Sequence, residues 1–270
     1  EIRPCDWSSD VCSSDLEGTI AVVAAASGVI TGKDDGYYDR NCSWGNNPPA
    51  NYVIVTHSDG SRAWYWHMKE GSVTSKPIGS TVESGEYLGK VASSGFSNIP
   101  HLHFEIRSAN NDVIDPWAGS CNETVESSWW IDQRPYWDPA INEIAIHYEA
   151  PSPFSNCPDP EDTRIRRTYN PGSDFFPAAY YRDQRLGDPT NFLLIQPDGQ
   201  VFTSWSHNSP SDYLTSWWYW QMKLPDNAMF GTWTYRIQYY EQVIDWTFEV
   251  SDACLSPLSL VVEKPGTKDA

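Results

Sequence analysis

Residues 100–107 read Pro-His-Leu-His-Phe-Glu-Ile-Arg, a short run in which polar and apolar side chains alternate. Alternation with a period of two predicts a β-strand with one buried face, and it puts residues i and i+2 on the same face. We therefore expect His101 and His103 side by side, about 6–7 Å apart, with Leu102 and Phe104 in a core. One imidazole of such a pair can bind a metal ion while the other handles a proton. Two solvent-facing histidines would give the same pattern, so the flanking sequence has to decide.

The flanking sequence predicts further strands of the same sheet. Residues 52–67 contain Asp59-Gly60 between two β-rich segments, a strong hairpin signal, and end in Tyr65-Trp66-His67. Residues 79–91 follow with the pattern V-x-x-G-x-x-L-G. This order resembles the lysostaphin-like (LytM-type) zinc endopeptidases of bacterial cell walls. In that family a hairpin ends in Tyr-x-His, a V-x-x-G-x-x-I/L-G segment follows, and Pro-His-Leu-His-Phe-Glu closes the site. The resemblance covers residues 18–116.

The resemblance implies a LytM-type antiparallel β-sheet peptidase domain with Zn²⁺ as cofactor. Carried over by position, it implies that His103 is a zinc ligand. It implies that His101 is the general base, or its partner in orienting water, and that His67 is the second catalytic histidine. Tyr65 and Asn98 are the implied substrate-binding residues.

The first zinc motif of the family, H-x-x-x-D, has no counterpart here, because the chain contains no histidine before His57. Residues 6–16 read Asp-Trp-Ser-Ser-Asp-Val-Cys-Ser-Ser-Asp-Leu and resemble a translated sequencing-adapter contaminant. We therefore treat residues 1–17 as an artefactual or disordered leader; a genuine polar leader is the alternative. We expect the native sequence upstream of Gly18 to supply the two absent ligands, and the chain as written to be inactive.

Two functions fit these observations. The first is a secreted zinc metalloendopeptidase that hydrolyses peptide bonds of peptidoglycan, in its stems or cross-bridges, or of Gly-rich peptides. The alternative is a non-catalytic LytM-like binding or regulatory module, which the absent motif would fit. A module without catalysis has no physical reason to keep His67, His101 and His103 together, which favours the enzyme. Glu105 shares the face of the His-Leu-His pair, and it could either orient a histidine or be a surface charge.

The amino-acid composition limits the classes of partner and the cellular location that we expect for the protein. The formal net charge of −18 argues against nucleic-acid binding, which needs basic patches. No run of 18 apolar residues exists, so we expect no transmembrane helix. The 14 Trp, 15 Tyr and 20 Pro indicate a β-rich protein that is secreted, periplasmic or part of the cell envelope. The expected partner is peptidoglycan or a peptide substrate.

The rest of the chain predicts a second β-rich unit. Residues 117–160 look like a connector with a short helix at 138–147, where Asp138 would be the N-cap and Pro139 the first helical residue. Residues 161–254 carry short β-rich runs at regular spacing, which favours an Ig-like β-sandwich. Residues 255–270 read as a linker or tail. The predicted fold class is therefore mainly β.

The cysteines predict disulfides. Without Cys5 and Cys12 of the adapter-like segment, four cysteines remain and none forms a C-x-x-C pair, so a structural zinc site is not expected. Four cysteines allow three pairings. We expect the two pairs Cys42–Cys121 and Cys157–Cys254; four free thiols are the alternative.

Overall fold

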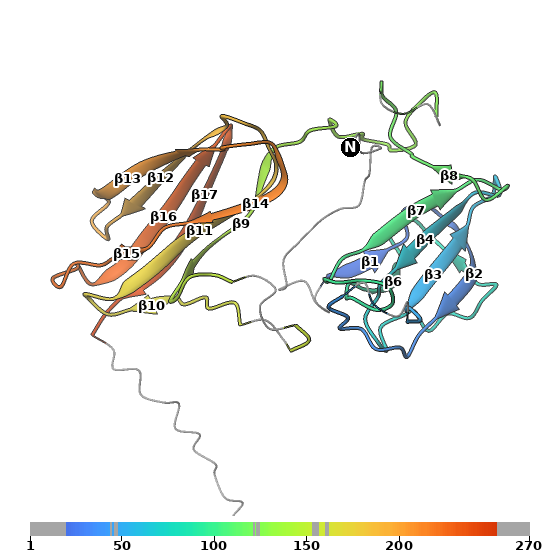
Figure 1. Cartoon of the computed structure of the whole chain (residues 1–270), viewed down its shortest axis with the longest axis horizontal. Helices are drawn as coiled ribbons and strands as arrows, with labels where there is room; N and C mark the ends of the chain where they lie inside the picture. The colour runs from blue at the N-terminus through green and yellow to red at the C-terminus, as the bar shows by residue number, and fades with distance from the viewer. Residues whose placement is uncertain are drawn as a thin grey trace, which may run out of the picture.

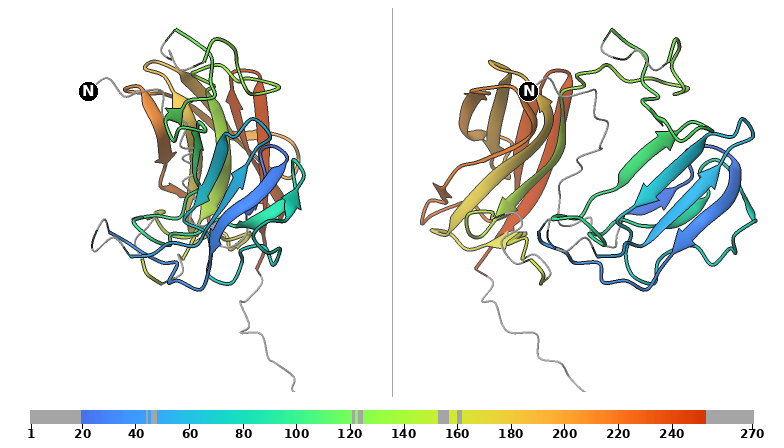
Figure 2. Two further views of the ribbon diagram at one scale, coloured as in Figure 1. Left: turned by 90° about the vertical axis from the view of Figure 1, so that its right-hand side faces the viewer. Right: turned by 45° about the vertical axis from the view of Figure 1, so that its right-hand side comes forward.

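The computed structural model describes residues 20–43, 45, 48–120, 122, 125–152, 157–159 and 162–252. Within these residues every regular element is a β-strand, which confirms the predicted mainly β fold. The strands form two bodies joined by the segment between β8 and β9 (Figure 1; Figure 2, right). No helix among the described residues is long and apolar enough to cross a membrane. The predicted leader and tail lie outside the described residues.

The first body contains a six-stranded antiparallel sheet in the order β5-β2-β3-β4-β7-β8, and β1 paired with β6. The predicted hairpin is present, since β3 and β4 pair from Val53↔Tyr65 to Thr56↔Arg62, and Gly60 between them has a φ of 83°. That left-handed backbone conformation suits glycine. The strand bounds are β1 Ala21–Val23, β2 Gly28–Asp34, β3 Tyr52–Thr56, β4 Arg62–Trp66, β5 Thr81–Val82, β6 Tyr87–Lys90, β7 His103–Arg107 and β8 Val113–Ile114.

Alternation along β3, β4 and β7 separates the two faces of the six-stranded sheet. Val53, Tyr65 and Ile106 point into a core that also takes in Val22 of β1 and Leu88 of β6. The alternate residues of β4 and β7 lie on the opposite face, where Trp66 is the cross-strand neighbour of His103. The strand pattern therefore places His103 on the outer face of the sheet, while Leu102 and Phe104 pack against the core.

The second body consists of two sheets around one core. One sheet has the order β10-β17-β16-β12-β13, in which only the β10–β17 pair is parallel. The other pairs β11 with β9, β14 and β15. Trp233, Tyr181, Phe192 and Ile146 are among the buried side chains that both sheets contribute to the core. The Ig-like character of this unit stays a prediction. The bounds are β9 Ala140–His147, β10 Thr168–Tyr169, β11 Asp174–Gln184, β12 Pro189–Ile195, β13 Val201–Asn208, β14 Tyr213–Tyr219, β15 Met222–Lys223, β16 Gly231–Tyr239 and β17 Gln242–Val250.

The helix predicted at 138–147 is wrong, because this segment contains strand β9. The ladder to β11 shifts register between Tyr180↔Glu143 and Tyr181↔Ile141, so one residue of β9 is extra at this point. Such a β-bulge interrupts the alternation. Ile141 and Ile144 consequently both reach the core, at a spacing of three residues that imitates a helix. The segment expected to be a connector thus contributes to the second core.

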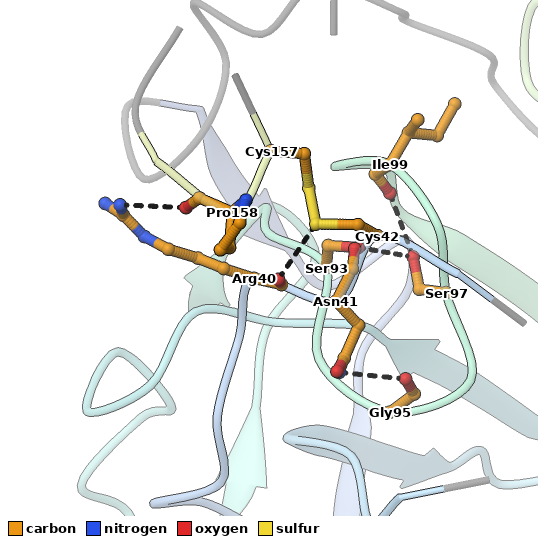
Figure 3. The surroundings of a disulfide bond; sticks show 9 residues. All are labelled: Arg40, Asn41, Cys42, Ser93, Gly95, Ser97, Ile99, Cys157 and Pro158. Carbon is orange, nitrogen blue, oxygen red and sulfur yellow. Dashed lines mark hydrogen bonds between the residues drawn. A yellow bond between two sulfur atoms is a disulfide. The ribbon is translucent and has the colours of Figure 1, made fainter. Parts of the chain in front are cut away.

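The predicted Cys42–Cys121 and Cys157–Cys254 pairs are also corrected. The structure joins Cys42 to Cys157, with their Cα atoms 5.9 Å apart (Figure 3). Arg40 Nη1 donates to the carbonyl oxygen of Pro158 at 3.3 Å, so the two segments run together beside the bond. Cys121 and Cys254 lie outside the described residues. The pairing follows from loop packing across a separation of 115 residues, which spacing along the chain does not encode.

Candidate active site

Three imidazoles gather at the end of β4 and the start of β7. The ring centroids of His67 and His101 lie 4.7 Å apart, and those of His67 and His103 lie 5.7 Å apart. His67 has a φ of 65°, a left-handed conformation that residues other than glycine rarely adopt. The backbone of Ala92 joins the first two histidines, because its N–H donates to His67 O at 3.1 Å and its carbonyl accepts from His101 N at 3.0 Å.

Hydrogen bonds to carbonyl oxygens fix the tautomer of two of these rings. His67 Nδ1 lies 2.6 Å from Ser94 O, and His101 Nδ1 lies 2.8 Å from Ile99 O. A carbonyl oxygen can only accept, so Nδ1 is the donor in both rings. The neutral rings therefore carry no proton on Nε2, which is free to accept one or to accept a hydrogen bond.

The environment of His67 keeps its ring neutral. The residue is 8% exposed, and burial lowers the pKa of His67 to about 4. The bond to Ser94 opposes this shift, while the neighbouring His101 and His103 add to it. His67 is consequently a neutral imidazole near pH 7, and it can act as a proton or hydrogen-bond acceptor but not as a resident cation.

His103 is the most open of the three histidines. Its side chain is 45% exposed, and its Nε2 lies 3.6 Å from Glu105 Oε2. The other carboxylate oxygen of Glu105 accepts from Arg107 Nε at 2.5 Å, and Arg107 itself lies over the Trp64 ring at 4.7 Å. Glu105 is therefore held beside His103, which favours an orienting carboxylate over a free surface charge.

The two residues implied for substrate binding differ in position. Tyr65 is 1% exposed, and its hydroxyl accepts from Ala25 N at 2.8 Å. A side chain in the core cannot touch a substrate at the surface, so the structure does not support that role for Tyr65. Asn98 lies half-buried in the loop just before His101, and its role stays a prediction.

Sequence reasoning missed the aromatic strip next to the histidines. On the outer face, Trp66 stacks on Tyr52 with ring centroids 4.7 Å apart, and Trp64 and Trp66 stack at 5.7 Å. Because Trp66 pairs with His103 across the ladder, this strip runs away from the imidazoles over β4 and β3. The sequence contained a signal for this strip, because Trp64 and Trp66 are two residues apart in a predicted strand and so share one face.

The donor set does not complete a zinc site. Across the part of the chain that the structure describes, no group of three or more His, Cys, Asp or Glu side chains is placed to hold a metal ion. His103 is the single implied ligand present, whereas a catalytic zinc takes three protein ligands. These residues alone do not fit Zn²⁺.

The sequence is similar to known peptidases. Residues 14–116 match the profile of peptidase family M23. A glycyl-glycine endopeptidase, ALE-1, of Staphylococcus capitis is 34% identical over 77 residues, which is 27% of this chain and 20% of that protein. The DD-carboxypeptidase/endopeptidase Mpg of Neisseria meningitidis serogroup B is 36% identical over 97 residues, covering 35% of this chain and 19% of that protein.

A similar structure has also been solved. The catalytic domain of lysostaphin from Staphylococcus simulans is 29% identical, with a TM-score of 0.27, over 36% of this chain and 66% of that one. The matched region spans about a fifth of the length of the ALE-1 and Mpg relatives. The residues matched by the family profile, 14–116, include all the strands of the first body.

Proposed function

We propose, on the premise that residues 14–116 are a domain of peptidase family M23 of the LytM type, that this protein hydrolyses peptide bonds of peptidoglycan. The bonds would lie in the stems or cross-bridges, or in Gly-rich peptides. The relatives named glycyl-glycine endopeptidase and DD-carboxypeptidase/endopeptidase support this substrate class. Such a substrate places the protein in the periplasm or cell envelope, or outside the cell.

The observation that carries the proposal is the contact of His67 with both His101 and His103. Hydrolysis of a peptide bond needs a base that takes a proton from water and a donor that stabilises the tetrahedral oxyanion. His101, with an unprotonated Nε2, suits the first task. His67 starts neutral and lies beside His101, so its Nε2 can take over the proton that His101 removed from the water and pass it to the leaving amine.

Zinc is the proposed cofactor, with His103 as one ligand. When bound, it would supply a water of lowered pKa and polarise the scissile carbonyl. The remaining two ligands, a His and an Asp, are the H-x-x-x-D motif that the printed sequence lacks. The chain as printed is therefore expected to bind zinc weakly and substoichiometrically.

The test uses the chain joined to its native upstream sequence, as read from the genome. Zinc is measured by elemental analysis after dialysis, and cleavage is followed with purified muropeptides and a pentaglycine peptide. We expect one zinc per chain and hydrolysis of at least one substrate. Absence of both stoichiometric zinc and cleavage would refute the proposal.

Three histidine variants separate binding from chemistry in that protein. His103→Gln should lose the zinc and the activity together, whereas His67→Gln and His101→Gln should keep the zinc and lose the activity. His57→Gln is the matched control, because His57 Nδ1 bonds to Ser27 O on the exposed surface. It should change neither quantity.

A non-catalytic binding or regulatory module is the second candidate. The observation that favours it is the absence, among the described residues, of a group able to hold a metal ion. This candidate predicts that the extended protein binds muropeptides or a protein partner without cleaving them. Cleavage that depends on His101 would exclude it.

A further inference from the structure

A buried hydrogen-bond network connects His101 to the loop that carries Cys42. Ser97 Oγ lies 2.9 Å from Ile99 O and 3.4 Å from His101 Nδ1, and 2.8 Å from Ser93 Oγ. Ser93 Oγ in turn donates to Asn41 O at 2.7 Å. Ser93 is 2% exposed and Ser97 is 0% exposed, so neither hydroxyl has bulk water as an alternative partner. Figure 3 shows Ser97 and Ser93 linked to each other and to the carbonyl of Ile99.

One arrangement of protons lets each hydroxyl donate once along this path. His101 Nδ1–H donates to Ile99 O, with Ser97 Oγ as a second, longer acceptor. Ser97 donates to that same Ile99 O, and Ser93 donates to Asn41 O. The two hydroxyl oxygens lie 2.8 Å apart, so Ser93 is in direct contact with Ser97. Ser97 thus supports the carbonyl that keeps the proton of His101 on Nδ1 and leaves Nε2 unprotonated.

The end of this path is anchored to the segment between β9 and β10 of the second body. Asn41 N donates to Ser93 O at 3.0 Å, and its Nδ2 donates to Gly95 O at 3.0 Å. The next residue, Cys42, is bonded covalently to Cys157. The same loop, residues 93–99, presents Ser94 O to His67 Nδ1 at 2.6 Å. A displacement of the Cys42 loop would therefore reach both histidines.

We propose that Ser97 and Ser93, held by Asn41, are positioning residues that hold the Ile99 carbonyl, which fixes the orientation and tautomer of His101, and that the Cys42–Cys157 disulfide keeps them in place. The disulfide thus couples the geometry of the site to the segment between β9 and β10 of the second body. That this arrangement serves hydrolysis rests on the proposed function. The positioning of His101 does not depend on the proposed function, and it can be tested without substrate or metal.

The experiment records long-range ¹H–¹⁵N spectra of the full chain with ¹⁵N-labelled histidine, at one fixed pH near 8. We expect His101 as a single Nδ1–H tautomer in the wild type. Ser97→Ala should replace it with a mixture of tautomers, and Ser97→Thr, which keeps the hydroxyl, should restore it. The double variant Cys42→Ser/Cys157→Ser should lose the single tautomer in the same way as Ser97→Ala.

Two other histidines report whether the fold is intact. His57 Nδ1 bonds to Ser27 O at 2.9 Å in the first body, and His147 Nδ1 bonds to Thr163 O at 2.6 Å in the second body. The tautomer of His57 should be unchanged in every variant, and that of His147 should be unchanged in the Ser97 variants. A single Nδ1–H tautomer of His101 in Ser97→Ala would overturn the positioning role. Retention of that tautomer in the double cysteine variant alone would overturn the anchoring by the disulfide. Neither result depends on peptidase activity, so failure here is distinct from failure of the proposed function.

Discussion

Gly95 is the position at which a single methyl group should disturb the site most. It lies in the loop between Ser94 and Ser97, its φ is 76°, and an added Cβ would lie 2.5 Å from Ala50 Cβ. Such a distance is far inside ordinary van der Waals contact. Gly95→Ala therefore adds both backbone strain and a steric clash to the loop that holds His67 and His101.

Each contribution has a separate magnitude. The left-handed conformation costs an alanine about 1–2 kcal/mol, and overpacking of a buried contact costs about 1–3 kcal/mol. Gly95→Ala should therefore lower the free energy of unfolding of the first body by roughly 2–5 kcal/mol. Gly36 isolates the first contribution, because its φ is 90° and an added Cβ would meet nothing within 4 Å. Gly36→Ala should cost only about 1–2 kcal/mol.

The assay is a urea titration followed by the amide signals of Val53 and Val55, which report the first core only. Following one core avoids the assumption that the whole chain unfolds in one step. The double variant Ala50→Gly/Gly95→Ala removes the atom that the new methyl group meets. In a double-mutant cycle, Ala50→Gly should recover the steric part of the cost and leave the backbone part.

Equal losses for Gly95→Ala and Gly36→Ala would show that the contact with Ala50 relaxes freely. That result would refute the claim that this loop is rigidly packed. A cycle without coupling between positions 50 and 95 would lead to the same conclusion.

Three further predictions concern other parts of the molecule. Burial raises the pKa of Tyr65 to about 12, so its neutral form stabilises the fold below the ordinary tyrosine pKa near 10. That stability is lost as pH rises from about 10 to 12, and urea titrations should show the wild type losing stability relative to Tyr65→Phe over this range. Phe192 is fully buried in the second core. Phe192→Ala should therefore lower the free energy of unfolding of the second core by about 3–5 kcal/mol and leave the unfolding of the first core unchanged. A shift of both unfolding transitions would mean that the two cores unfold together. Proteolysis of the unreduced protein should yield a peptide linking Cys42 to Cys157, and a mass spectrum showing Cys42 joined to Cys121 would contradict the structure.

The sequence by itself determined the first sheet and the identity of its histidines. The period of two along residues 52–67 and 100–107 is a local property, and burial of one face fixes which side chains share the other. The Asp59-Gly60 turn sets the register of the hairpin locally as well. The grouping of His67 with His101 and His103 came instead from the resemblance to the LytM-type family. A period of two along β4 would put His67 on the core face with Tyr65, and its φ of 65° breaks that period.

Only the tertiary structure decided the features that depend on distant segments. The bulge in β9 gives this strand the apolar spacing of a helix, and the bulge itself arises from the pairing with β11, a distant segment. Cys42 found Cys157 because two loops pack together across 115 residues. The carbonyls of Ser94 and Ile99 fix the tautomers of His67 and His101. Because every residue has a backbone carbonyl, the sequence does not indicate which carbonyls accept these bonds.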